Sequence, residues 1–67
     1  MQQYNEIIST ERILTVKEVS VMLNIKVGTL YRLARENRIP TISIGKIKRF
    51  SEADVLAWIE KRKNSVA

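Results

Sequence analysis

The sequence predicts one mainly helical domain with a single β-hairpin, and three observations lead to this prediction. Apolar residues recur at helical spacing in three segments. Two runs rich in β-branched residues surround a turn that contains glycine, as in a hairpin. Pro40 stands between the second helical segment and the first of these runs, where it prevents the helix from continuing. The expected order is helix, tight turn, helix, hairpin, helix.

The three helices are predicted from apolar stripes that fall on one helical face. The first helix covers residues 16–23, the second begins near Val27, and the third follows Ser51. Each stripe is expected to face the core. The stripes consist of Val16, Val19 and Leu23, flanked by Met22; Val27, Leu30 and Ala34, beside Leu33; and Val55, Leu56, Trp58 and Ile59.

Residues with capping chemistry mark where two of the helices start. Thr15 and Glu18 have the spacing of a capping box, in which each side chain accepts a hydrogen bond from the other residue's amide. Ser51 and Asp54 form a shorter relative of this motif before the third helix. Leu14 precedes the first cap, where an apolar residue packs against the helix. Capping explains these polar residues, so none of them needs a catalytic role.

Asparagines predict the ends of the first two helices. Asn24 and Asn37 follow the apolar stripes, and asparagine tolerates the left-handed backbone that terminates a helix. Because residues 24–26 alone connect the two helices, these should cross steeply, as in a helix-turn-helix.

The hairpin is predicted over residues 41–44 and 47–50, with Gly45 first in a two-residue turn of type II′. Ile42 and Ile44 share one face of this hairpin. An isolated hairpin is only marginally stable, so the isoleucine face is expected to pack on the helices.

The positive charge of the chain is concentrated in its middle third. Twelve Lys and Arg residues against seven acids give a net charge of +5. Residues 26–49 hold seven of these cations and a single acid, Glu36, so this segment alone carries +6. A concentrated field of one sign attracts a polyanion such as nucleic acid. The alternative interpretation is a basic, solvated face without a partner.

The composition argues against several kinds of site. The chain contains neither Cys nor His, which removes disulfides, thiolate and imidazole metal ligands, and the Ser-His-Asp type of relay. A metal site of carboxylates alone stays possible in principle, but no catalytic residue, metal or cofactor is expected. No apolar run approaches the roughly 20 residues that cross a bilayer, and the first residues do not resemble a secretory signal. A cytoplasmic protein without a membrane partner is expected.

A set of short motifs in a fixed order resembles one known family. The motifs are Leu14 to Val19, Leu23 to Ile25, Thr29 to Arg32, Arg38 to Pro40, and Ile44-Gly45 with Arg49-Phe50. Together they are similar to the excisionase-type branch of the MerR-like DNA-binding domains, over roughly Ile13 to Ile59. This resemblance implies a winged helix-turn-helix. In that family the second helix enters the major groove, and the hairpin, called the wing, touches the DNA backbone or the adjacent minor groove.

The sequence departs from the pattern of this family in several places. Asn24 and Asn37 stand where such domains usually have glycine, which leaves the implied fold unaffected. Lys26 replaces a usual Ser or Thr cap, and Val27 and Gly28 take places that are often polar or basic. The base preference of the family therefore cannot be transferred to this chain.

The expected DNA contacts follow from the residue types on the second helix and on the wing. Arginine can bond two acceptors of guanine, threonine can meet a thymine methyl or a phosphate, and lysine suits a phosphate. Glycine lets the start of a helix, with its free amides, approach a phosphate closely. The candidate contacts of the second helix are Lys26, Val27, Gly28, Thr29, Tyr31, Arg32 and Arg35. Those of the wing are Ser43, Lys46, Lys48 and Arg49.

Several side chains also have a structural interpretation. Arg35 could pair with Glu36 or cover apolar surface, and Tyr31 could form the edge of the core. Trp58 is expected in the core rather than stacked on a base. The cations of residues 61–63 are expected at a solvated helix end, where they favour the helix dipole.

Three parts of the chain are expected. Residues 1–12 read as a flexible arm, in which Tyr4 or the pair Ile7-Ile8 could dock on the body. Residues 13–63 form the winged helix-turn-helix, and residues 64–67 form a C-terminal tail.

The expected function is that of a small, non-enzymatic protein that binds double-stranded DNA at specific sequences. An excisionase, or recombination directionality factor, is favoured because the chain is little more than the domain. Several copies would bind and bend DNA near the attachment site of a mobile element and bias an integrase towards excision. The alternative is a small MerR-like transcriptional regulator, although no dimerisation helix or effector domain is evident and no small-molecule ligand is expected. An RNA-binding or basic protein-interaction module is the other class considered, but few aromatic residues remain to stack on RNA bases.

Overall fold

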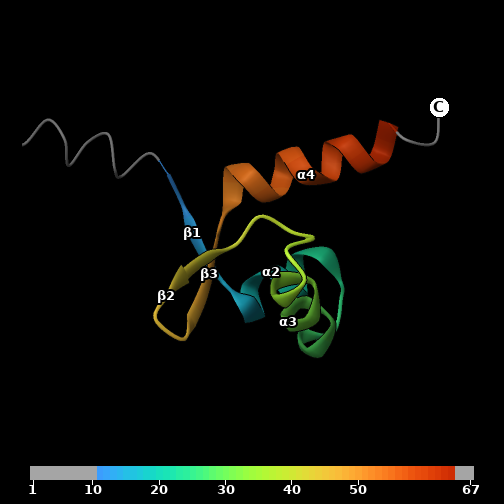
Figure 1. The fold of residues 1–67 in the computed structure, drawn as a ribbon. Helices are drawn as coiled ribbons and strands as arrows, with labels where there is room; N and C mark the ends of the chain where they lie inside the picture. The colour runs from blue at the N-terminus through green and yellow to red at the C-terminus, as the bar shows by residue number, and fades with distance from the viewer. Residues whose placement is uncertain (1–10, 65–67) are drawn as a thin grey trace, which may run out of the picture.

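The computed structural model describes residues 11–64. In chain order its elements are β1 (Ile13–Thr15), α2 (Val16–Leu23), α3 (Val27–Arg35), β2 (Ile42–Ile44), β3 (Ile47–Ser51) and α4 (Glu52–Asn64) (Figure 1). These helices and strands form a winged helix-turn-helix, which confirms the predicted fold class. Residues 1–10 of the predicted arm, including Tyr4 and Ile7-Ile8, and residues 65–67 of the predicted tail lie outside the described residues.

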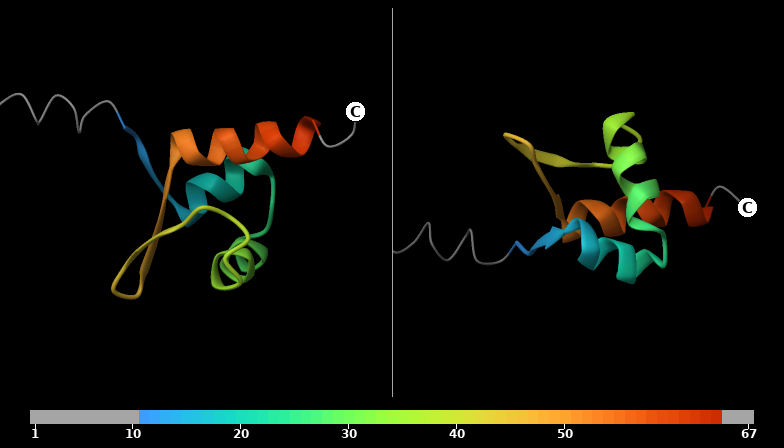
Figure 2. Two further views of the ribbon diagram at one scale, coloured as in Figure 1. Left: turned by 45° about the horizontal axis from the view of Figure 1, so that its top comes forward. Right: turned by 90° about the horizontal axis from the view of Figure 1, so that it is seen from below.

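The second helix of the turn and the tip of the hairpin lie on the same side of the molecule. Helix α4 runs along the opposite side, with its C-terminal end pointing away from the sheet (Figure 1). The left view of Figure 2 shows the same arrangement, and the right view shows α3 and the hairpin tip together on the side away from α2. No helix within residues 11–64 is long and apolar enough to span a membrane.

The sheet contains one strand more than the predicted hairpin. Strand β1 pairs antiparallel with β3, so the strand order is β1-β3-β2. Leu14 lies opposite Phe50, and Thr15 lies opposite Arg49. The Glu52 amide continues this contact by donating a 2.9 Å hydrogen bond to the carbonyl of Arg12. Strand β1 was not predicted from the sequence, because three residues are too few to show an alternating pattern.

The core is built where the sheet meets α2, α3 and the start of α4. Phe50 and Leu30 are the largest of its fully buried side chains. Trp58 and Ile59 of α4 are partly buried against this cluster, as their stripe predicted. The buried apolar residues of the described chain are Leu14, Val16, Val19, Leu30, Ala34, Ile39, Phe50 and Val55.

Three apolar residues that were predicted to face the core are exposed instead. Leu56 is 49% exposed because it follows the buried Val55, and neighbouring helical residues point about 100° apart. Val27 is 38% exposed at the first position of α3. Ile44 is 59% exposed because the sheet buries its other face, the one that carries Phe50. The prediction that the Ile42 and Ile44 face covers the helices was therefore wrong for Ile44, while Ile42 is half-buried.

The backbone angles confirm the predicted ends of the first two helices and the predicted hairpin turn. Asn24 and Asn37 both have φ of 57°, the left-handed conformation that asparagine tolerates. The Asn24 amide donates to the carbonyls of Ser20 and Val21, which ends α2. In the hairpin turn Gly45 has φ of 61° and Lys46 has no positive φ, which is the φ pattern of the predicted type II′ turn.

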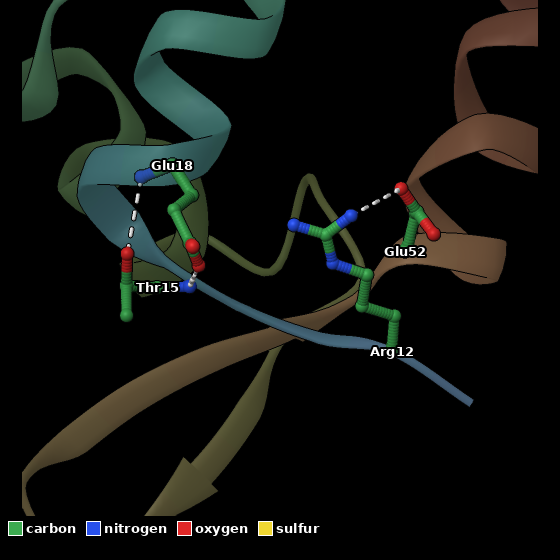
Figure 3. A network of polar contacts seen from close by, with 4 residues as sticks. All are labelled: Arg12, Thr15, Glu18 and Glu52. Carbon is green, nitrogen blue, oxygen red and sulfur yellow. Dashed lines mark hydrogen bonds and ion pairs between the residues drawn. The ribbon is translucent and has the colours of Figure 1, made fainter. Parts of the chain in front are cut away.

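The predicted capping box at the start of α2 is present. The Thr15 amide donates to Oε1 of Glu18 at 2.8 Å, and the Glu18 amide donates to Oγ1 of Thr15 at 3.1 Å (Figure 3). The hydrogen bond from the Thr15 amide lowers the pKa of the Glu18 carboxyl below its usual value of 4.5. The predicted cap of α4 is also present, since the Asp54 amide donates to Oγ of Ser51 at 3.3 Å.

We expect Glu18→Gln to flatten the acid side of the pH–stability profile. Folding lowers the pKa of this carboxyl, so its ionised form stabilises the folded chain fully above pH 4.5. That contribution is lost as the pH falls through the lowered pKa. Glutamine keeps an oxygen for the Thr15 amide but does not titrate. The difference in free energy of unfolding between wild type and variant should therefore shrink below pH 4.5, as urea unfolding at successive pH values would measure. Parallel profiles would contradict this expectation.

Candidate nucleic-acid interface

Helix α3 is held by one buried face and presents the opposite face to solvent. Leu30 and Ala34 are buried one helical turn apart, and Leu33 is packed beside them. The other side carries most of the candidate contacts predicted from the sequence. Lys26, Gly28, Tyr31, Arg32 and Arg35 are exposed, and Thr29 is half-buried.

The start of α3 has no side-chain cap. Lys26 occupies the N-cap position with an extended backbone, and its side chain makes no capping hydrogen bond. The first turn also contains no acidic residue. The amide groups of Val27 and Gly28 therefore meet no capping side chain at the positive end of the helix dipole, where an anion is stabilised.

Nothing in the folded chain requires glycine at position 28. A Cβ built on Gly28 would meet no atom within 4 Å. Glycine in a helix costs about 1 kcal/mol relative to alanine, so this residue weakens α3 without relieving any contact inside the protein. The helix backbone at Gly28 is therefore open to approach from outside.

The two arginines of α3 form no ion pair with an acidic residue in the part of the chain that the structure describes. Glu36 pairs with Arg38 at 3.7 Å, and not with Arg35, so the proposed pairing of Arg35 with Glu36 is wrong. No carboxylate of residues 11–64 forms an ion pair with Arg32 or Arg35. Their positive charge is therefore left uncompensated on the exposed face of the helix.

The hairpin separates its polar residues between the two faces of the sheet. Ser43 lies opposite Lys48, and the Lys48 ammonium donates a 2.9 Å hydrogen bond to the Ser43 hydroxyl. Because side chains alternate along β3, this pair shares the face of Phe50, which enters the core. Arg49 points to the other face and is half-buried, with its guanidinium donating to the Lys48 carbonyl at 2.9 Å.

The predicted wing contacts are thus not all brought together. Lys46 is exposed in the turn itself, between the two faces. Lys48 and Ser43 lie on the face of the sheet that meets the helices, whereas Arg49 lies on the opposite face. The alternation of Lys48 and Arg49 along the chain already contains this signal, but only the position of Phe50 shows which of them faces the helices.

The segment after α3 is fixed by α4, and this contact was not predicted. The Trp58 indole donates a 2.9 Å hydrogen bond to the Arg38 carbonyl, and the Arg62 guanidinium lies 4.2 Å from the centre of the Trp58 ring. One face of the ring is therefore covered by a cation. Arg38 is an exposed cation beside the candidate contacts, and its ion pair with Glu36 offsets its charge.

A comparison with protein families connects this arrangement to known domains. Residues 13–63 match the family described as helix-turn-helix domain, and this match covers well over half of the chain. Comparisons with curated proteins and with solved structures found no match. The match includes α2, α3, the hairpin and nearly all of α4, the elements described above. This chain belongs to the helix-turn-helix domain family, whose members bind DNA.

Proposed function

We propose that this protein is a small, non-enzymatic, sequence-specific double-stranded DNA-binding protein. In this proposal α3 lies in the major groove and the β2–β3 hairpin contacts the adjoining backbone or minor groove. The observation that carries it is the uncompensated charge of Arg32 and Arg35 on the exposed face of α3. The hairpin tip lies on the same side of the molecule (Figure 2).

The dimensions and chemistry of α3 fit a major groove. An α-helix with its side chains is about 10–12 Å in diameter, and the major groove is about 12 Å wide. Arg32 and Arg35 each carry a guanidinium that can donate two hydrogen bonds to the O6 and N7 acceptors of guanine, and Thr29 adds a methyl and a hydroxyl group. The free amides at Val27 and Gly28 suit a phosphate at the groove edge, where Lys26 adds a charge. On the wing, Lys46, Lys48 and the Ser43 hydroxyl are proposed to contact phosphates, with Arg49 at the margin.

The affinity for duplex DNA should fall steeply with salt. If about four of the cations contact phosphates, log affinity plotted against log salt concentration should have a slope of roughly −4. We suggest first selecting a duplex from a random-sequence pool with the full chain. Its dissociation constant is then measured by fluorescence anisotropy at several salt concentrations. Heparin is the control polyanion. Equal affinity for heparin, the selected duplex and unselected duplexes would contradict sequence-specific binding.

The biological role that we favour is that of an excisionase acting with an integrase on a mobile element. The support is the resemblance of the motifs from Leu14 to Phe50 to excisionase-type domains. In this role several copies bind side by side near an attachment site and bend the DNA. If an integrase is encoded next to this protein, the pair should excise a marked element from a plasmid more efficiently than the integrase alone. Unchanged excision, with altered transcription from a promoter that holds the selected site, would instead indicate a transcriptional regulator.

A further inference from the structure

Two isoleucines form an exposed apolar pair at the end of the hairpin. Ile44 and Ile47 lie directly opposite each other on β2 and β3, on either side of the Gly45–Lys46 turn. Their side chains are 59% and 49% exposed. They lie on the face of the sheet opposite to Phe50 and are not part of the buried core of residues 11–64.

The needs of the fold do not explain this pair. A β-branched residue stabilises a strand, and threonine does so as well as isoleucine at an exposed site. Leaving two isoleucines about half exposed forgoes part of the stabilisation that full burial gives. Unlike a single exposed apolar residue, the two adjoin each other and form a contiguous apolar surface, the kind of feature that marks binding sites. The chain has polar residues elsewhere on this hairpin, at Ser43, Lys46 and Lys48.

The surroundings of the pair indicate a polyanionic partner with an apolar interior. Lys46 lies in the turn between the two isoleucines, and Lys48 and Arg49 follow Ile47 on β3. No carboxylate forms an ion pair with these three cations within the described chain. Lys48 lies on the face of the sheet opposite to the isoleucines, Arg49 lies on their face, and Lys46 lies in the turn. Cations on both faces and at the tip of a hairpin that carries an apolar pair are complementary to DNA, in which phosphates flank the stacked bases.

We infer that Ile44 and Ile47 form a wedge that enters the minor groove beside the α3 site and partly unstacks one base step. This inference rests on the proposed DNA-binding function. Lys48 and Arg49, which point to opposite faces of the hairpin, hold the phosphates on the two sides of the groove, and the isoleucine side chains near the tip contact the bases between them. Apolar wedges of this kind kink DNA towards the major groove by roughly 20–90°. Because pyrimidine–purine steps unstack most easily, the wedge favours such a step next to the sequence that α3 reads.

The wedge is tested with the double variant Ile44→Thr/Ile47→Thr. Threonine retains the branched Cβ and the strand preference, and it leaves every charge in place. The matched control is Val21→Thr on α2, where an apolar side chain is even more exposed but lies away from the hairpin. The probe is the duplex selected with the wild-type chain, carrying fluorophores at its two ends. Energy transfer between the ends reports the bend, and anisotropy reports the affinity.

The wild type should bend the duplex, and the double variant should bend it by less than half as much. Its affinity should fall about tenfold, because the wedge contacts and part of the bend are lost together. The control should behave as the wild type does. Thermal unfolding followed by circular dichroism checks that the variant is folded. If the double variant unfolds early, the single variants Ile44→Thr and Ile47→Thr replace it.

The outcomes separate the wedge from the proposed function. A wild type that binds the duplex without bending it, or a variant that bends it equally, would overturn the wedge and leave DNA binding intact. Unchanged DNA behaviour combined with loss of self-association in the variant would assign the pair to a contact between copies, which also overturns the wedge. Failure of the wild type to bind any duplex would overturn the proposed function together with the wedge.

Discussion

Replacing Phe50 with alanine should lower the free energy of unfolding by about 3–5 kcal/mol, the usual cost of deleting a fully buried aromatic side chain. Phe50 is fully buried where β3 meets the helices, and it lies opposite Leu14 of β1. A chain of this size has a total stability of only about 3–10 kcal/mol. We therefore expect the variant to be largely unfolded at physiological temperature, as circular dichroism and urea unfolding would show.

Two further variants make this expectation quantitative. Phe50→Leu keeps most of the apolar volume, so its stability should lie between that of the alanine variant and that of the wild type. Leu56→Ala is the matched control because Leu56 was also predicted to face the core but is half exposed on α4. Its free energy of unfolding should change by less than about 0.5 kcal/mol. Equal losses for Phe50→Ala and Leu56→Ala would show that the core is placed incorrectly.

The largest effect on DNA binding is expected for Arg32→Ala. Arg32 is exposed on α3 and forms no ion pair with a carboxylate of residues 11–64, so its removal should leave the fold unchanged. Loss of a bidentate hydrogen-bonded contact to guanine should cost about 1–3 kcal/mol of binding free energy and relax the base preference at one position of the site. The measurement is a competition of the selected duplex against duplexes that differ from it at single positions.

Lys48→Ala should give a different pattern, because this cation is assigned to a phosphate. Binding to every duplex should weaken by a similar factor, and the salt slope should become shallower by about one. Lys61→Ala on α4 serves as the control, since α4 runs along the side of the molecule away from α3 and the hairpin tip (Figure 2). Unchanged binding in both Arg32→Ala and Lys48→Ala would place the DNA-binding surface elsewhere.

The features that the sequence predicted correctly depend on neighbouring residues. The bounds of α2, the Thr15–Glu18 capping box and the left-handed Asn24 and Asn37 each depend on chemistry within one or two helical turns. The turn at Gly45 is equally local. Short-range rules of this kind were therefore sufficient to place the helix-turn-helix and the hairpin in order.

The features that the sequence did not predict depend on long-range pairing. Strand β1 exists only because β3 offers it an edge, and nothing near Leu14 signals this. The exposure of Ile44 follows from the face on which Phe50 is buried. In the candidate site, too, some features could be predicted from the local sequence and others depend on long-range packing. Residue types identified Arg32 and Arg35 as candidate contacts, whereas the burial of Phe50 decides that Lys48, and not Arg49, lies on the face that meets the helices.

The pairing of β1 with β3 also sets the order in which the chain can fold during its synthesis. Leu14 and Phe50 are separated by 36 positions, so closing this loop costs about 3 kcal/mol of chain entropy. Helices α2 and α3 are close in sequence and can associate earlier. β1 leaves the ribosome before them, yet it has no partner until β3 has followed. A nascent chain that ends before Phe50 therefore has α3 but lacks a closed core.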